Sequence, residues 1–266
     1  MSAAGVWARL RAWSPPVSLP QRGATPWAVD ARGRPWSPAA AARVEALSQR
    51  HDLGRVRALC GPVARAESLW ALDVLDRWLP PWSPADAAHP RGLDVGAKNG
   101  SYLAGLAAAW PHGWDLVELD AHRRYLDGTT RRAHGEAMAA SHPGCRYLAG
   151  DVRESQALHA RITWFLPFLA PETHGAWGLP IGDFAPEALL RHVLGRLAPG
   201  GTLLVVNQGP DEAEAQGVLL ERVLGRRGAT PSRPPPGVSV EPLGVLESPL
   251  SPYRHARIGW RIRREG

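Results

Sequence analysis

The stretch LDVGAKNG (residues 93–100) ends a short apolar segment and contains two glycines before a segment with helical character. Such a turn lets backbone N–H groups and the start of a helix approach a ligand, as in dinucleotide-binding folds. A nicotinamide fingerprint would require glycine at position 98 and glycine or alanine at position 101, where this chain has Lys98 and Ser101. We interpret the stretch as a ligand-binding turn that is not of the nicotinamide type.

The same strand–turn–helix pattern repeats along the chain after this turn. Apolar segments at 92–97, 114–120, 145–152, 162–169 and 201–208 alternate with helical stretches at 100–110, 122–140, 184–197 and 211–226, and strand-like pieces at 238–247 and 255–263 follow. This alternation predicts an α/β fold with a mostly parallel, twisted sheet and helices on both faces. The last two pieces predict a C-terminal antiparallel hairpin.

The chain before the glycine turn has a different character. Residues 64–79 have the spacing of an amphipathic helix, and the Pro-rich stretch 79–90 predicts its end. The charged side chains opposite the apolar face of this helix are Glu67, Asp73, Asp76 and Arg77. We predict a mainly helical N-terminal cap or substrate region over 1–85 and a ligand-binding domain over 86–266.

Acidic residues follow the second and third apolar segments. Glu118 and Asp120 lie slightly more than 20 residues beyond the glycine turn. An acid at about this separation in the sequence is placed to accept hydrogen bonds from ribose hydroxyls. Asp151 ends the third segment, where a carboxylate can accept a hydrogen bond from an adenine amine; the alternative is an ordinary helix cap.

The ordered set of motifs resembles the class I S-adenosylmethionine-dependent methyltransferases. The matching segments are LDVGAKNG (93–100), VELD (117–120), AGDV (149–152) and LAPGGTLLVV (197–206), and the resemblance covers roughly residues 86–266. It implies a Rossmann-like methyltransferase fold and S-adenosyl-L-methionine as the cofactor.

The resemblance also implies roles for single residues. Gly96 and Gly100 would border the methionine part of the cofactor, and Asp94 would orient its ammonium group directly or through water. Glu118, with Asp120 as the alternative, would hold the ribose, and Asp151 with Val152 would flank adenine. Two residues complete the expected cofactor set: Lys98, which replaces the usual middle glycine and faces either solvent or the cofactor carboxylate, and Trp164, a core or pocket-wall residue.

The acceptor side is less defined. Amino-group methylases carry Asn or Asp, then Pro-Pro and an aromatic residue, whereas this chain has Phe165-Leu166-Pro167-Phe168. Methylation of a base or of a glutamine amide is therefore not expected. The long segment 169–184 contains His174, the best candidate for a general base because imidazole titrates near neutrality. Asn207, at the end of the fifth strand, is expected to orient an acceptor.

The composition bears on whether the protein binds nucleic acid, binds a metal, or is secreted or membrane-bound. The net charge is +6 and only Lys98 among the 31 basic residues is a lysine; the scattered arginines fit a coding bias with solvated faces better than a polyanion-binding surface. Cys60 and Cys145 provide neither a disulfide scaffold nor a zinc motif, so no metal site is expected. No secretory signal or run of ~18 apolar residues is found, and a cytoplasmic location is expected.

The function expected from these observations is methyl transfer from S-adenosylmethionine to a small-molecule acceptor. One alternative is an RNA or protein methyltransferase that uses arginines of the N-terminal region, including Arg43, Arg50, Arg55 and Arg57. Another is a non-catalytic module that binds S-adenosylmethionine within a larger assembly. The oligomeric state has no signal in the sequence.

Overall fold

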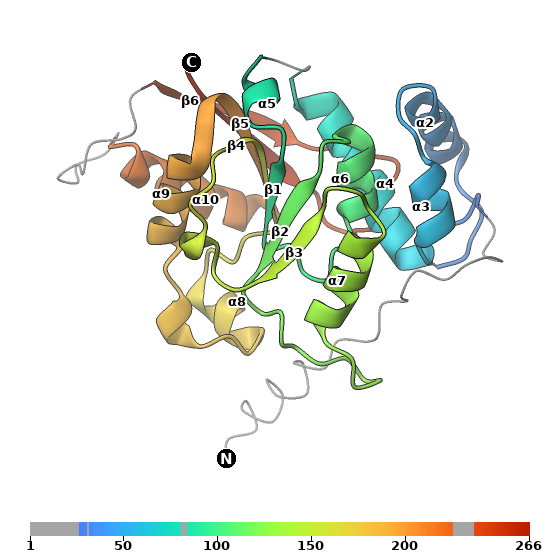
Figure 1. The fold of residues 1–266 in the computed structure, drawn as a ribbon, viewed down its shortest axis with the longest axis horizontal. Coiled ribbons are helices and arrows are strands. Elements are labelled where there is room, and N and C mark those ends of the chain that lie inside the picture. The colour runs from blue at the N-terminus through green and yellow to red at the C-terminus, as the bar shows by residue number, and fades with distance from the viewer. Residues whose placement is uncertain (1–26, 31, 81–83, 226–236) are drawn as a thin grey trace.

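The computed structural model describes residues 27–30, 32–80, 84–225 and 237–266, and the expectations for residues 1–26, 81–83 and the Pro-rich loop before 237 lie outside them. The centre of the fold is a seven-stranded sheet with helices on both faces (Figure 1). Its strands are β1 (Gly92–Val95), β2 (Trp114–Glu118), β3 (Arg146–Ala149), β4 (His159–Phe165), β5 (Leu197–Asn207), β6 (Val238–Val245) and β7 (Ile258–Arg264).

The strand order is β3-β2-β1-β4-β5-β7-β6. The first five strands are parallel, and β7 pairs antiparallel with both β5 and β6. The predicted α/β fold, with a mostly parallel sheet and a C-terminal antiparallel hairpin, is confirmed. Because the order reverses between β1 and β4, the carboxyl ends of these strands flank a crevice in which open α/β sheets bind ligands.

The helices form two layers. Helices α2 (Pro38–Ser48), α3 (Gly54–Leu59), α4 (Pro62–Trp78), α6 (Leu103–Ala109) and α7 (Arg131–Ala140) lie on one side, and α8 (Pro171–Ala176), α9 (Pro186–Arg196) and α10 (Pro210–Val223) lie on the other, with the short α5 (Pro84–Ala88) near the sheet's end (Figure 1). Side chains alternate between these layers: Leu116 and Leu204 pack on the first side, and Val117 and Leu203 on the second.

The N-terminal helices share a core with the sheet. Leu72 of α4 and Leu103 of α6 are fully buried in one hydrophobic cluster with Leu116. The backbones of α4 and α6 approach so closely that a Cβ on Gly105 would lie 1.9 Å from the carbonyl oxygen of Ser68. The N-terminal region therefore packs directly against the sheet's own helical layer.

The charged side of α4 is also covered. Glu67 and Asp73 are 6% and 0% exposed, although the helical pattern places them opposite the apolar face. Asp73 accepts hydrogen bonds from Arg43 of α2, from Arg77 and from the Ser248 hydroxyl. Because partners from α2 and from the β6–β7 loop surround α4, this helix is buried on more sides than its sequence indicates.

Several predicted boundaries differ from the structure, and two of them have a clear local cause. The helix expected from residue 122 begins at Arg131, because Thr130 caps it by accepting from the backbone N–H of Ala133 and Gly128 turns the preceding loop at a φ of +84°. The fifth strand begins at Leu197, before the segment 201–208 that was expected to form it, and glycine fits at position 201 because a Cβ there would lie 2.8 Å from the carbonyl oxygen of Ala198.

No helix in the described part of the chain is long and apolar enough to cross a membrane.

Candidate functional site

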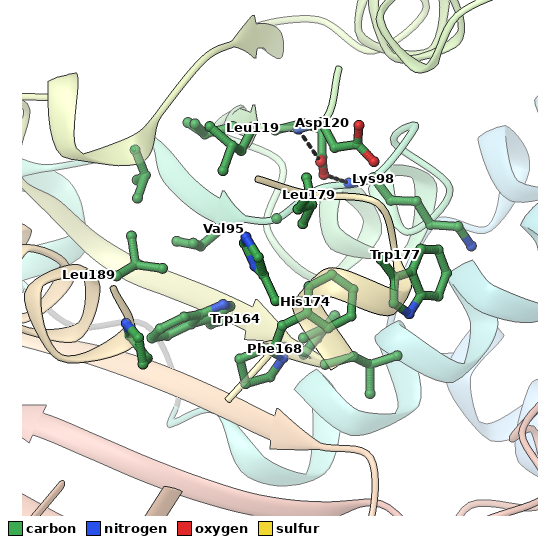
Figure 2. Close-up of a pocket in the computed structure, with 18 of the residues that line it drawn as sticks. Val95, Lys98, Leu119, Asp120, Trp164, Phe168, His174, Trp177, Leu179 and Leu189 are labelled. Atoms are coloured by element: carbon green, nitrogen blue, oxygen red, sulfur yellow. Dashed lines mark hydrogen bonds between the residues drawn. The ribbon is translucent and has the colours of Figure 1, made fainter. Parts of the chain in front are cut away.

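A cavity of about 360 Å³ lies at the carboxyl ends of the central strands, within the range typical of small-molecule sites. It brings together most of the residues expected in the site: Gly96, Lys98, Glu118, Asp120, Asp151, Val152, Trp164 and His174. Figure 2 shows Leu119 and Asp120 on one side of this space and Trp164, His174 and Phe168 on the other. Asp94, Gly100 and Asn207 are not among its lining residues.

The glycine turn is held by the neighbouring strand. The N–H groups of Gly96 and Ala97 both donate to the carbonyl oxygen of Val117, at 2.9 and 3.0 Å. Gly96, Lys98 and Gly100 all have left-handed backbone, with φ of 70°, 56° and 75°. Lys98 thus adopts at a cost the conformation that glycine adopts freely, since left-handed backbone is unfavourable by roughly 1–2 kcal/mol for residues with a Cβ.

Glu118 connects this turn to the end of β2. Its Oε2 accepts from the N–H of Lys98 at 2.6 Å, and its Oε1 accepts from the N–H of Asp120 at 2.8 Å. The side chain is almost completely buried, and this burial raises the pKa of Glu118 although Arg131 and the two N–H groups act in the opposite direction. Oε1 also accepts from Nη1 of Arg131 at 3.4 Å, so Oε2 is the oxygen that retains lone-pair capacity for a ligand hydroxyl.

Asp120 belongs to a cluster that the sequence did not reveal. Its Oδ2 accepts from Arg123 and, at 3.2 Å, from Arg131. The two guanidinium groups lie 5.4 and 5.9 Å from the ring centre of Trp177. Because the prediction placed both arginines on one long helix, it gave no indication that they converge on the acid after β2.

Asp151 serves as both a cap and a wall of the cavity. Its side chain accepts from the N–H of Arg153 at 2.8 Å at the start of a short 3-10 helix and pairs with the Arg153 guanidinium. These hydrogen bonds from Arg153 lower the pKa of Asp151. The helix-cap interpretation is therefore correct for this residue, and its position at the cavity leaves the adenine role open to a test.

Asp94 lies beneath the cavity. Its Oδ1 accepts from the hydroxyl of Thr163 on β4 at 2.7 Å, while Oδ2 is buried without a hydrogen-bond partner. Burial raises the pKa of Asp94 to about 7. Gly100 has a packing role, because a Cβ there would lie 3.3 Å from Cβ of Met138 on α7.

The acceptor-side candidates are separated by the fold. His174 lies on α8 and is 5% exposed; its Nε2 is 2.9 Å from the carbonyl oxygen of Pro180, and its ring contacts Phe184 edge-on. Because a carbonyl only accepts, Nε2 carries the proton and Nδ1 is left as the basic nitrogen of neutral His174. Asn207 is fully buried and does not line the cavity.

Polar residues from distant segments line the cavity beside α4. Lys98 Nζ lies 3.0 Å from Glu67 Oε1. The hydroxyl groups of Tyr102 and Tyr253 are 2.6 Å apart. Arg257, from the β6–β7 loop, completes this group. The sequence pattern predicts a strand over 255–263, so it gives no sign that Arg257 lines a cavity.

No group of three or more His, Cys, Asp or Glu side chains suited to a metal ion is present among residues 27–30, 32–80, 84–225 and 237–266.

No family model and no curated protein matches this chain. Solved structures with a similar fold include CalS10, an amino pentose methyltransferase from Micromonospora echinaspora with bound SAM (24% identity, 55% of this chain and 53% of that chain, TM-score 0.34). The mitomycin 7-O-methyltransferase MmcR matches with 19% identity over 75% of this chain and 54% of its own, with a TM-score of 0.41. In both cases the match spans about half of the other protein.

The plantazolicin methyltransferase BpumL, in a complex with SAH, matches with 12% identity over 86% of this chain and 91% of its own, with a TM-score of 0.43. This chain is similar in fold to each of these three proteins. The likeness lies in the arrangement of the strands.

Proposed function

We propose that this protein is an S-adenosylmethionine-dependent methyltransferase with a small-molecule acceptor. One observation carries the proposal: the glycine turn after β1 and the acids after β2 and β3 line the same cavity at the reversal point of the sheet. Glu118 and Asp151 come from segments 33 positions apart, and only the parallel order β3-β2-β1 places them side by side with Gly96.

The residues present fit this cofactor. Around Gly96 nothing lies within 4 Å of a Cβ position, so the turn leaves room for a ligand beside its backbone. Glu118 is positioned for the ribose hydroxyls, and Asp151 with Val152 for adenine. The free Oδ2 of buried Asp94 is an acceptor that an ammonium group would satisfy through water.

The cofactor would supply a methyl group that its sulfonium already activates, so the protein's main contribution is positioning. Trp164 and Phe168 contribute an apolar wall to this part of the cavity. Where the acceptor carries a proton at attack, Nδ1 of His174 is the candidate base.

A small acceptor is favoured over a nucleic acid by the contacts of the N-terminal arginines. Arg43 and Arg50 pair with Asp76, and Arg55 donates to the carbonyl oxygen of Ser141. Arg57 lies over the ring of Trp27 at 4.5 Å. These groups contact the protein itself, and α4 contributes Glu67 to the cavity. We therefore propose that region 1–85 covers the site and selects a small acceptor in the domain formed by 86–266, in a cytoplasmic protein.

The test is isothermal titration with S-adenosylmethionine, S-adenosylhomocysteine and NADH, followed by transfer of a labelled methyl group to a panel of metabolites. Binding of the two adenosyl ligands but not NADH supports the cofactor assignment. Such binding also stabilises the folded protein: a ligand at 100 times its dissociation constant adds ~2.7 kcal/mol to the free energy of unfolding. Binding without turnover on any acceptor, together with a stable protein partner, would favour a non-catalytic module instead.

A further inference from the structure

Arg257 has an unusual environment for a buried guanidinium. It is 5% exposed and lines the cavity, and its Nη1 donates to the carbonyl oxygen of Gln208 at 2.7 Å. The guanidinium carbon lies 4.1 Å from the ring centre of Tyr253. The Nε group is buried without a hydrogen-bond partner. An arginine offers five donors, so most of the hydrogen-bonding capacity of Arg257 remains for a ligand.

The other cations that line the cavity are neutralised. Lys98 pairs with Glu67, Arg131 with Asp120, and Arg153 with Asp151. In the described part of the chain, no carboxylate oxygen is within 4.0 Å of Arg257. Leaving a buried charge without a counter-ion is costly, so an anion entering the cavity at this point would be stabilised.

Glu212 acts on Arg257 without an ion pair between the two side chains. Glu212 attracts Arg257 electrostatically, but its Oε2 accepts from the N–H of Gln208 at 2.5 Å, and its pKa is raised by burial. Burial also lowers the pKa of Arg257, and an arginine stays protonated near neutral pH. The cavity therefore presents one positive charge whose counter-ion is missing from its immediate surroundings.

The position of Arg257 separates it from the proposed cofactor residues. Those residues follow β1, β2 and β3, whereas Gln208 follows β5 and Arg257 precedes β7. The segment after β4, which includes Phe168, lies between the two halves because β4 stands between β1 and β5 in the sheet. The Arg257 end of the cavity also contains the hydroxyl pair of Tyr102 and Tyr253.

We propose that Arg257 binds an oxyanion, a carboxylate or a phosphate, on the methyl acceptor, and that the aromatic rings of Tyr102, Phe165 and Tyr253 hold the acceptor's apolar part. A guanidinium fork recognises both anions through paired hydrogen bonds. That the bound molecule is the methyl acceptor rests on the proposed function, whereas the anion site itself rests on Arg257 and its surroundings alone.

The experiment measures binding of three matched probes, benzoate, phenyl phosphate and the neutral benzamide, by ligand-observed NMR and calorimetry. It is done with and without S-adenosylhomocysteine. Hydrogen bonds to a charged group give about tenfold or more in affinity, so benzoate or phenyl phosphate should bind at least about tenfold more tightly than benzamide. The tighter of the two identifies the carboxylate or the phosphate as the preferred group.

Arg257→Gln should abolish this preference and leave S-adenosylhomocysteine binding unchanged, and Arg257→Lys should keep part of it. Arg263→Gln, at an exposed arginine of the adjoining strand β7, is the matched control and should behave as the parent protein. Equal binding of the three probes, or a preference that survives in a folded Arg257→Gln variant, overturns the inference. If the preference depends on Arg257 but S-adenosylhomocysteine does not bind, the anion site stands and the proposed function fails.

Discussion

The backbone N–H of Lys98 donates a 2.6 Å hydrogen bond to Oε2 of Glu118. This bond joins the turn after β1 to the acid after β2, two motifs that the sequence presents as separate. The carboxylate therefore has two functions, since it fixes the left-handed conformation of the turn and faces the cavity. Substitutions at either position are expected to affect both the turn and the ligand.

Glu118→Ala should weaken S-adenosylhomocysteine binding by ~1.5–3 kcal/mol, the usual range for hydrogen bonds to a charged group. Asp120→Ala should have a smaller effect, because Arg123 and Arg131 already occupy its carboxylate. Calorimetric titration of both variants, with exposed Glu136→Ala as the control, checks this prediction. A large loss for Asp120→Ala with none for Glu118→Ala would assign the ribose to Asp120.

Asp94 should make the protein less stable as the pH rises. Its pKa is about 7 in the folded protein against a usual value of 3.8, so between these pH values the folded state binds more protons than the unfolded state. The free energy of unfolding then falls with rising pH, by on the order of 2–3 kcal/mol between pH 5 and pH 8. Asp94→Asn should remove this component, which urea unfolding at the two pH values measures. An identical pH slope in both proteins would show that Asp94 is ionised throughout.

Gly105→Ala should disrupt the contact between α4 and α6. The new Cβ would overlap the Ser68 carbonyl, and overpacking of this kind typically costs ~1–3 kcal/mol. Gly195→Ala in α9 is the matched control, because nothing lies within 4 Å of its Cβ position. There the better helix propensity should stabilise by ~0.5–1 kcal/mol. Thermal unfolding of both variants tests the prediction, and equal shifts would contradict the close packing of the two helices.

Arg43→Gln should lower stability without changing affinity for RNA. Arg43 contacts Asp73, which is fully buried, and Asp76, so its loss leaves carboxylates short of a partner and should cost ~1–3 kcal/mol. Arg132→Gln, which breaks an exposed pair with Glu136, should stay within ~0.5 kcal/mol. Chemical denaturation and a filter-binding assay with a mixed RNA pool are the measurements. A marked loss of RNA binding in Arg43→Gln would support the polyanion alternative.

The alternation of strands and helices and the glycine turn could be predicted because their signals are local. Apolar segments of six to eight residues and the spacing of Gly96 and Gly100 appear directly in the sequence. The acid after β2 could be found for the same reason, since its distance from the turn is set by one helix and one strand. For these elements, short-range patterns and the right-handed crossover rule determine most of the topology.

The residues that the sequence did not reveal depend on long-range packing. Glu67 and Asp73 have the pattern of a solvated helix face, yet both are buried. Lys98 of the glycine turn pairs with Glu67, whereas Asp73 has partners from α2 and the β6–β7 loop. Arg257 lies 49 positions from Gln208, to which it donates. Asn207 shows the opposite error: it was expected in the site, but its side chain is buried and does not line the cavity. A residue's place at the carboxyl end of a strand does not determine on which side of the sheet its side chain is buried. Contacts between residues far apart in the chain leave no periodic pattern in the local sequence.

The placement of β7 has a consequence for the order in which the protein is completed during synthesis. β7 follows β6 in the chain, but it lies between β5 and β6 in the sheet, where it covers the edge of β5, and Arg257 directly precedes it. A nascent chain that has passed β5 must therefore hold an open sheet edge until Ile258–Arg264 leaves the ribosome, and such edges promote aggregation. Ligand binding at the Arg257 end can begin only after translation has reached the final strand.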